Sequence, residues 1–239
     1  MSNGLMQWYS GAFKQLNHSL YILIVLLFST VFASTASAAE PPTFKIGLAL
    51  WTGYPNNLQG FKDGLTESGI DIKNDITFVE GDITSDKDKQ RSAAEYFKSE
   101  KVDLVYSLTT PGTVIMKEIM PTTTPIVFSI VTYPADSGLI ESFEYSGNNL
   151  VGTSNYVHLQ HYVSLIKELV PDTKSAAIFH HTGEPNSNIQ ASNLIRLLKR
   201  QDIKVQNITA TNIADLKAQA ETLVDKVDLF ITTTDTLLQ

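Results

Sequence analysis

The sequence predicts an α/β protein with two lobes, each a parallel sheet flanked by helices. Strand and helix patterns alternate along the chain, which is the order of βαβ units. Residues 125–131 (PIVFSIV) form an apolar, β-branched run long enough for one strand with both faces covered, as in a parallel sheet. The alternation occurs in two series, and the chain passes from one to the other near residues 155–158. Two series predict two lobes.

The first series supplies an N-terminal lobe. Its strands are expected at residues 44–50, 76–79, 103–108 and 125–131, with a short strand within 148–156. Its helices are expected where apolar residues recur at helical spacing, at residues 58–65, 86–99 and 113–120. We therefore assign residues 39–155 to this lobe.

The second series supplies a C-terminal lobe, residues 156–239. Its strands are expected at residues 175–179, 203–208 and 228–232. Its helices are expected at residues 159–169, 189–198 and 213–223. The chain stops soon after the last expected strand, so we expect this second lobe to be incomplete at its C-terminus.

The first 38 residues have the pattern of a secretory signal peptide. Lys14 is their only formal charge, an apolar block fills residues 20–33, and Ala36-Ser37-Ala38 supplies the small residues of a cleavage site. The apolar block is short for a bilayer span. We expect an exported, periplasmic protein that begins near Ala39, with an uncleaved membrane anchor as the alternative because the polar leader is long.

Composition excludes several classes of function. Lys14 is the one charged residue that cleavage removes, so 17 basic residues remain against 25 acidic ones. A chain this acidic lacks the clustered cations that nucleic-acid binding requires. The sequence has no cysteine, which excludes disulfides, thiolate metal sites, a thiol nucleophile and a lipid anchor on cysteine.

Polar and aromatic residues follow the ends of several expected strands. Because ligands bind beyond the carboxyl ends of parallel strands, this pattern predicts a binding cleft for a small molecule. Hydroxyl groups and helix N-termini can hold a carboxylate without lysine or arginine, and aromatic rings can stack on an apolar group. Taken singly, each residue could instead cap a helix or form a turn. The candidate ligand-binding residues are Trp51, Tyr54, Thr109, Thr110, Thr132, Tyr133, Asn155, Asn186, Ser187 and Asp235.

The sequence contains no catalytic or metal-binding constellation that we can recognise. An S-x-x-K pattern at residues 164–167 lies within an amphipathic helix and has none of the accompanying motifs. His158 and His161 begin an expected helix, whereas His180 and His181 end an expected strand, where neighbouring side chains point to opposite faces. We therefore expect no metal site, no cofactor and no enzymatic activity.

The order and spacing of several short phrases identify a family resemblance. The phrases are residues 60–65 (GFKDGL), 125–128, 137–140 (SGLI), 152–154 (GTS), 166–172 (IKELVPD), 183–187 (GEPNS) and 234–235 (TD). Together they resemble the substrate-binding proteins of ABC transporters, in the branch associated with aromatic amino acids. The resemblance covers nearly all of the mature chain. It implies the type I periplasmic binding-protein fold, a small amino-acid-like ligand between the lobes and an ABC permease as partner.

Two departures from the family pattern lie at the expected ligand site. Members of this branch usually carry His-Pro and an acid where this chain has residues 54–57 (YPNN), and Thr-Asp-Pro where it has residues 132–134 (TYP). Asp235 matches the Thr-Asp of the family and is the candidate partner for a ligand ammonium, or else a helix N-cap. The departures indicate that the fold carries over more directly than the ligand does.

The function expected from these observations is capture of a small ligand by closure of two lobes, followed by delivery to a permease. The alternative is an extracytoplasmic ligand-sensing domain of a membrane-anchored signalling receptor. Sequencing the mature N-terminus would separate the two, because the sensor would retain residues 1–38. An enzyme on the same fold is a third class, which no residue of the sequence supports.

Overall fold

A computed structural model gives the structure of the protein and describes residues 43–238. The predicted signal peptide, residues 1–38, lies outside the described residues. The first lobe contains β1 (Phe44–Ala49), α2 (Pro55–Glu67), β2 (Ile76–Glu80), α3 (Lys87–Glu100), β3 (Leu104–Leu108), α4 (Thr110–Ile119), β4 (Ile126–Val131) and β5 (Leu150–Ser154). The second contains α5 (Leu159–Leu169), β6 (Ser175–His181), α6 (Pro185–Lys199), β7 (Lys204–Ala210), α7 (Ile213–Leu223) and β8 (Leu229–Thr232).

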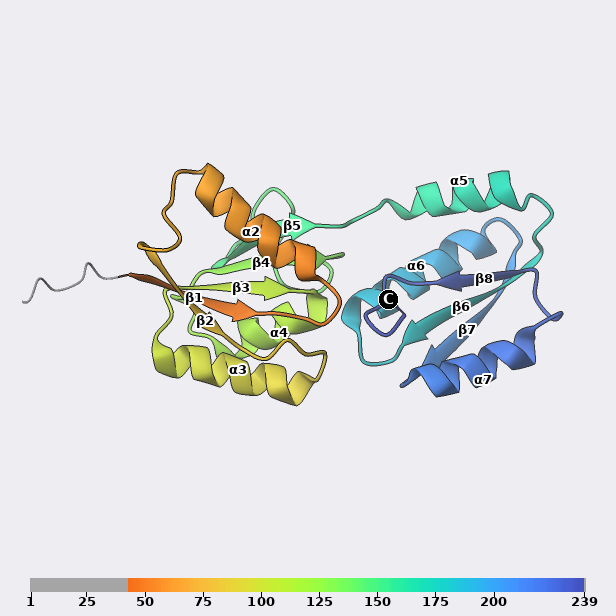
Figure 1. Cartoon of the computed structure of the whole chain (residues 1–239). Helices are drawn as coiled ribbons and strands as arrows, with labels where there is room; N and C mark the ends of the chain where they lie inside the picture. The colour runs from red at the N-terminus through yellow and green to blue at the C-terminus, as the bar shows by residue number, and fades with distance from the viewer. Residues whose placement is uncertain (1–42, 239) are drawn as a thin grey trace, which may run out of the picture. The chain divides into compact units, whose positions relative to one another are not determined.

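The strands form two separate parallel sheets (Figure 1). The first has five strands in the order β2-β1-β3-β4-β5, and the second has three in the order β7-β6-β8. Every pairing is parallel, which confirms the predicted fold class of two lobes built on parallel sheets. The lobe boundaries drawn from the sequence, 39–155 and 156–239, stay predictions.

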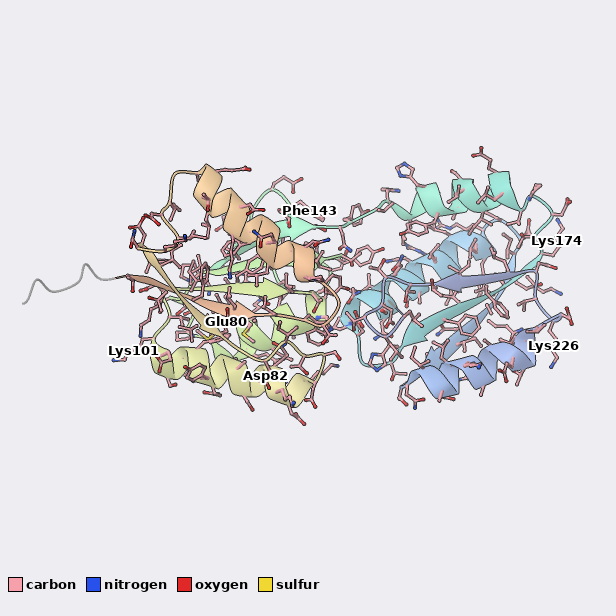
Figure 2. All side chains as sticks on the ribbon, in the orientation of Figure 1. Glu80, Asp82, Lys101, Phe143, Lys174 and Lys226 are labelled. Atoms are coloured by element: carbon pink, nitrogen blue, oxygen red, sulfur yellow. The ribbon has the colours of Figure 1, made fainter. Side chains whose placement is uncertain are left out.

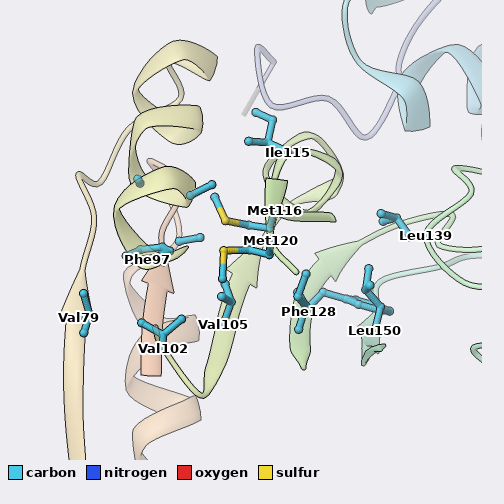
Figure 3. Close-up of a cluster of buried hydrophobic side chains, with 14 of the residues drawn as sticks. Val79, Phe97, Val102, Val105, Ile115, Met116, Met120, Phe128, Leu139 and Leu150 are labelled. Atoms are coloured by element: carbon cyan, nitrogen blue, oxygen red, sulfur yellow. The ribbon is translucent and has the colours of Figure 1, made fainter. Parts of the chain in front are cut away.

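Helices cover both faces of each sheet. On one face of the first sheet, Phe97 of α3, Met116 of α4 and Met120, which follows α4, belong to a buried cluster (Figure 3). On the other face, α2 places the ring of Phe61 against that of Tyr106, with centroids 4.1 Å apart. In the second lobe, α5 and α6 pack against one face and α7 against the other. Both faces of the central strands are thus buried, as the apolar strand sequences predict.

The same four residues, Lys-Val-Asp-Leu, lead into β3 (101–104) and into β8 (226–229). The lysines that begin both runs are labelled in Figure 2. Asp103 Oδ2 accepts a hydrogen bond of 2.7 Å from the backbone N–H of Lys45, at the start of β1. Asp228 accepts in the same way from two backbone N–H groups just before and at the start of β6. In each lobe an aspartate thus joins the starts of two neighbouring strands.

None of the helices in residues 43–238 has the length and apolar character needed to cross a membrane.

Candidate functional site

A strained residue follows β3 at the carboxyl edge of the first sheet. Thr109 has φ 69° and ψ 159°, a backbone region that is essentially reserved for glycine. Its hydroxyl accepts a hydrogen bond of 3.3 Å from the N–H of Gly112, so it caps α4, and its own N–H donates to Ser129 O at 3.0 Å. These bonds stabilise the strained backbone of Thr109. As a result, Thr109 alone separates the end of β3 from the start of α4.

Buried polar groups without protein partners gather at the start of α4. Thr110, the first residue of the helix, is 1% exposed, and its Oγ1 has no hydrogen-bond partner among the described residues. The Trp51 ring packs on the same turn, since a Cβ added to Gly112 would lie 3.2 Å from Trp51 Cε3. Trp51 Nε1 is also buried and unpaired within the described chain. A donor and a hydroxyl are therefore available here to a bound molecule.

A β-bulge shapes the end of β4. The register between β4 and β5 shifts between Phe128 and Val131, and Ile130 has φ 58°, which is unusual for a β-branched residue. The bulge leads into Thr132 and Tyr133, which are both buried. Burial raises the pKa of the Tyr133 phenol, so this ring remains neutral.

The second lobe places a fully buried carboxylate after β8. Asp235 Oδ2 accepts hydrogen bonds from the backbone N–H of His181 (2.6 Å) and from the hydroxyl of Ser187 (2.7 Å). Its Oδ1 accepts from the N–H of Leu237 at 2.8 Å. The last bond is typical of an aspartate that caps a turn. Asp235 therefore has a structural role, and its contact with a ligand ammonium stays a prediction.

A second buried carboxylate lies beside it, at Glu184. This residue precedes α6, is 2% exposed, and accepts two hydrogen bonds on Oε2 from the N–H (3.0 Å) and hydroxyl (2.7 Å) of Thr236. The pKa of the Glu184 carboxyl is raised to about 7, mainly because the group is buried and also because the Asp235 charge lies nearby, while the hydrogen bonds from Thr236 oppose the rise. Two buried carboxyl groups therefore lie close together, and one of them has a pKa near neutral pH. Such a pair can attract a cation.

Glu184 is absent from the residues predicted from the sequence. The local signal was present, because Glu184 lies between a buried strand and a proline that begins a helix. That position reads equally well as a turn residue. Its importance depends on Thr236, which is distant in the sequence.

Two cavities adjoin at Trp51. The first, of about 280 Å³, lies at the ends of β1 and β3 and is lined by Leu50, Trp51, Gly53, Tyr54, Pro55, Leu58, Ile83 and Leu108. The second, of about 110 Å³, has walls from both lobes and is lined by Trp51, Ser85, Lys87, Pro111, His181, Gly183, Glu184, Thr236 and Leu237. An apolar cavity and a smaller polar cavity thus share one aromatic wall.

One hydrogen bond crosses from the first lobe to the second beside the small cavity. Lys87 Nζ, at the start of α3, donates to the carbonyl oxygen of Gly183 at 2.7 Å. Gly183 directly precedes Glu184, so this bond holds the loop that carries the buried carboxylate.

The same corner contains the groups that come nearest to a metal site in the described part of the chain. Ligand atoms of His181, Glu184 and Asp235 lie within 4.8 Å of one another. However, one oxygen of each carboxylate already accepts two hydrogen bonds. His180 turns away, and its Nε2 lies 2.8 Å from Asn207 Oδ1. We do not identify a metal site from these contacts.

The structure brings together only some of the predicted site residues. Trp51 and Tyr54 line the larger cavity, and Thr109 and Thr110 lie on the helix turn beside it. Asn186, Ser187 and Asp235 form one hydrogen-bonded cluster in the second lobe, where Asn186 Nδ2 and Ser187 Oγ both lie within hydrogen-bonding distance of Thr234 O.

The remaining predicted residues lie at the ends of β4 and β5. Tyr133 packs edge-on against Tyr156, with ring centroids 5.6 Å apart, and the carbonyl of Thr132 accepts a hydrogen bond from the Ser154 hydroxyl. Asn155 is exposed, and its N–H donates to Val131 O. These contacts give all three residues a structural role.

Residues 53–239 match the family model described as ABC transporter substrate binding protein. The chain belongs to this family. The substrate-binding protein is 30% identical over 184 residues to a "Tyrosine-binding protein" of Clostridioides difficile (strain R20291), which covers 75% of this chain and 49% of the relative. The chain thus spans about half the length of that curated relative.

Solved structures share the fold of this substrate-binding protein. An ABC domain in complex with L-Trp from Streptococcus pneumonia has a TM-score of 0.73 at 23% identity, over 82% of this chain and 67% of that one. A conserved domain protein from Vibrio cholerae has a TM-score of 0.71 at 26% identity, over 79% and 64%. The type I periplasmic binding-protein fold implied by the sequence is confirmed.

Proposed function

We propose that this protein is the periplasmic solute-binding component of an ABC transporter and captures an aromatic amino acid between its two lobes. The observation that carries the proposal is the position of Trp51, whose ring lines both an apolar cavity and a small cavity containing a buried carboxylate. An aromatic amino acid has the matching arrangement, with an apolar ring and an ammonium joined by a short link.

Each part of such a ligand has a counterpart in the protein. The aromatic ring goes into the 280 Å³ cavity between Trp51 and Tyr54. The ammonium goes to the buried carboxylates Glu184 and Asp235. The ligand carboxylate goes to the start of α4, where the Thr110 hydroxyl lacks a protein partner among the described residues. A similarity to a tyrosine-binding relative supports the same class of ligand.

Closure of the lobes is the proposed mechanism of capture. A ligand that contacts Trp51 in one lobe and Glu184 in the other stabilises the closed arrangement more than the open one. The bond from Lys87 to Gly183 forms only when the two lobes approach at this edge. It therefore adds to the stability of the closed state.

Location and partner follow from the family. We propose export through the N-terminal segment and delivery of the ligand to an ABC permease of the inner membrane. N-terminal sequencing of the cellular protein tests this: a start near Ala39 supports the soluble periplasmic form. A membrane-bound protein that retains Met1 or Ser2 would favour the sensor alternative instead.

Ligand class is tested by calorimetric titration with L-tyrosine, L-tryptophan and two truncated analogues. Tyramine lacks the carboxylate, and 3-(4-hydroxyphenyl)propionate lacks the amine. We expect the complete amino acids to bind and each analogue to bind at least about tenfold more weakly, since a buried partner is left unpaired. Equal binding of the propionate would contradict the role given to the second lobe.

A further inference from the structure

We propose that Glu184 is the residue that pairs with the ammonium group of the ligand, and that ligand capture releases a proton from this side chain. The inference rests on the proposed function, because it requires a ligand that bears an amine. To the proposed function it adds the residue that selects a positively charged ligand group. It also makes ligand capture depend on pH.

The geometry favours Glu184 over Asp235 as the contact. Glu184 lines the 110 Å³ cavity, whereas Asp235 is fully buried behind it. Asp235 accepts three hydrogen bonds from its own lobe, which fix its position. The two bonds from Thr236 to Glu184 both end on Oε2, so they occupy one oxygen of that carboxylate. Asp235 thus acts as a positioning residue, and its negative charge influences the site by raising the pKa of Glu184.

A second acceptor without a donor in the described part of the chain belongs to Asn186, two residues after Glu184. Asn186 is 3% exposed, and its Oδ1 has no hydrogen-bond partner among the described residues. The amide nitrogen of the same side chain donates to Thr234 O at 2.6 Å. An ammonium group carries three donors and can therefore satisfy more than one acceptor of this corner.

The other charged groups around the cavity come from three elements. Lys87 projects from α3, His181 ends β6, and Asp235 follows β8, while α4 contributes the uncharged Pro111. Lys87 donates to the carbonyl of Gly183, and no ion pair within 4 Å joins Lys87 to Glu184 in the described residues. A carboxyl group that is buried beside a carboxylate has a raised pKa and keeps its proton to higher pH.

The proton balance follows from these surroundings. Burial and the Asp235 charge raise the pKa of Glu184, so the ligand-free protein in this arrangement of the lobes carries a proton on this carboxyl on the acid side of neutrality. An arriving ammonium is already charged and favours the carboxylate. The carboxyl O–H bond breaks, the proton passes to solvent, and the carboxylate pairs with the ammonium. Affinity therefore rises by about tenfold per pH unit up to the pKa of the free carboxyl and then levels.

Titration calorimetry of the full chain with L-tyrosine tests the inference. Measurements in two buffers of different ionisation enthalpy give the number of protons released. We expect nearly one proton at about pH 6 and almost none at about pH 8. Glu184→Gln should release none at either pH and should bind at least about tenfold more weakly at pH 8. Binding of 3-(4-hydroxyphenyl)propionate, which lacks the amine, should release no proton and should be little changed by the substitution.

Two control variants separate other sources of a proton effect. His181 also lines this cavity, and His181→Gln should keep the release if Glu184 is its source. Glu168→Gln changes an exposed glutamate of α5 in the same lobe and should alter nothing. Binding of L-tyrosine by the unmodified protein without proton release would overturn the inference alone. If no aromatic amino acid binds at all, the proposed function fails and the inference fails with it.

Discussion

Glu184 and Thr236 are joined by two hydrogen bonds: Glu184 Oε2 accepts one from the Thr236 N–H at 3.0 Å and one from its hydroxyl at 2.7 Å. The pair connects the loop after β6 to the segment after β8. Together with the bonds that Asp235 accepts from His181 and Ser187, these two bonds hold two segments that are distant in the sequence next to each other.

Replacing this carboxylate should change the pH dependence of stability. The pKa of Glu184 is raised from 4.5 to about 7 in the folded protein, so folding favours the protonated form. The stability that protonation contributes is present below about pH 4.5 and is lost as the pH rises to about 7. Glu184→Gln should abolish this loss and exceed the unmodified protein in free energy of unfolding by roughly 2–3 kcal/mol at pH 8.

Urea unfolding of both proteins at about pH 5 and pH 8 measures this difference. Thr236→Val supplies the opposite change, since it removes one donor to Glu184 Oε2 and should destabilise the protein more at pH 8 than at pH 5. A Glu184→Gln variant that is less stable than the unmodified protein at pH 8 would contradict the raised pKa.

Gly152 should not tolerate a side chain. A Cβ at this position would lie 2.1 Å from the carbonyl oxygen of Phe128 and 2.6 Å from its ring. Gly152→Ala should therefore destabilise the pairing of β4 with β5 by about 2 kcal/mol or more. Thermal unfolding followed by circular dichroism measures the effect. Gly64→Ala is the matched control: it has open space in α2 and should stabilise by about 0.5–1 kcal/mol.

Trp51 should report directly on ligand capture. In a Trp8→Phe background it is the remaining tryptophan of the chain. Since its ring is 3% exposed and lines both cavities, added L-tyrosine should change its fluorescence. Trp51→Ala should weaken binding by at least about tenfold, or about 1.4 kcal/mol. Phe143→Ala removes an exposed aromatic ring of the same lobe (Figure 2) and should leave binding unchanged.

Lys87 should matter for binding and little for the stability of either lobe. Its side chain is exposed and donates across the lobes to the Gly183 carbonyl. Lys87→Met should reduce affinity for L-tyrosine by about two- to tenfold, mainly through faster dissociation, because the closed state loses one charge-assisted bond. Lys89→Met, which removes only a surface pairing to Asp82 at 3.9 Å, should leave dissociation unchanged in stopped-flow measurements.

The fold follows from the sequence because hydrophobic periodicity identifies the buried faces. The helix expected at residues 86–99 is α3, whose apolar residues Ala93, Ala94 and Phe97 are all buried, and the run at residues 125–131 becomes the inner strand β4. The start of α4 differs from its prediction. The helix begins at Thr110 rather than Thr113, because Pro111 fits the first turn of a helix and Thr109 adopts a backbone conformation that its side chain does not indicate.

The sequence could place the candidate site only at the carboxyl edges of the two sheets. It could not tell which side chains there line a cavity. Strand order places Trp51, Thr109 and Asp235 at the carboxyl ends of parallel strands, and that placement needs no tertiary detail. Which carboxylate lies against the cavity depends on hydrogen bonds between distant segments. Such contacts decided that Asp235 is enclosed by its own lobe while Glu184 lines the cavity, and no local pattern in the sequence contains that information.

Asp228, which precedes β8, helps to position the candidate site from the far end of that strand. A slip of one residue between β8 and β6 would turn every side chain of β8 to the opposite face and shift the segment that follows it. Asp228 opposes such a slip because it binds the first N–H groups beside β6. The position of Asp235 and Thr236 next to Glu184 is thus determined at the opposite end of the strand. A residue at one end of a strand thus helps to set the geometry of a site at the other end.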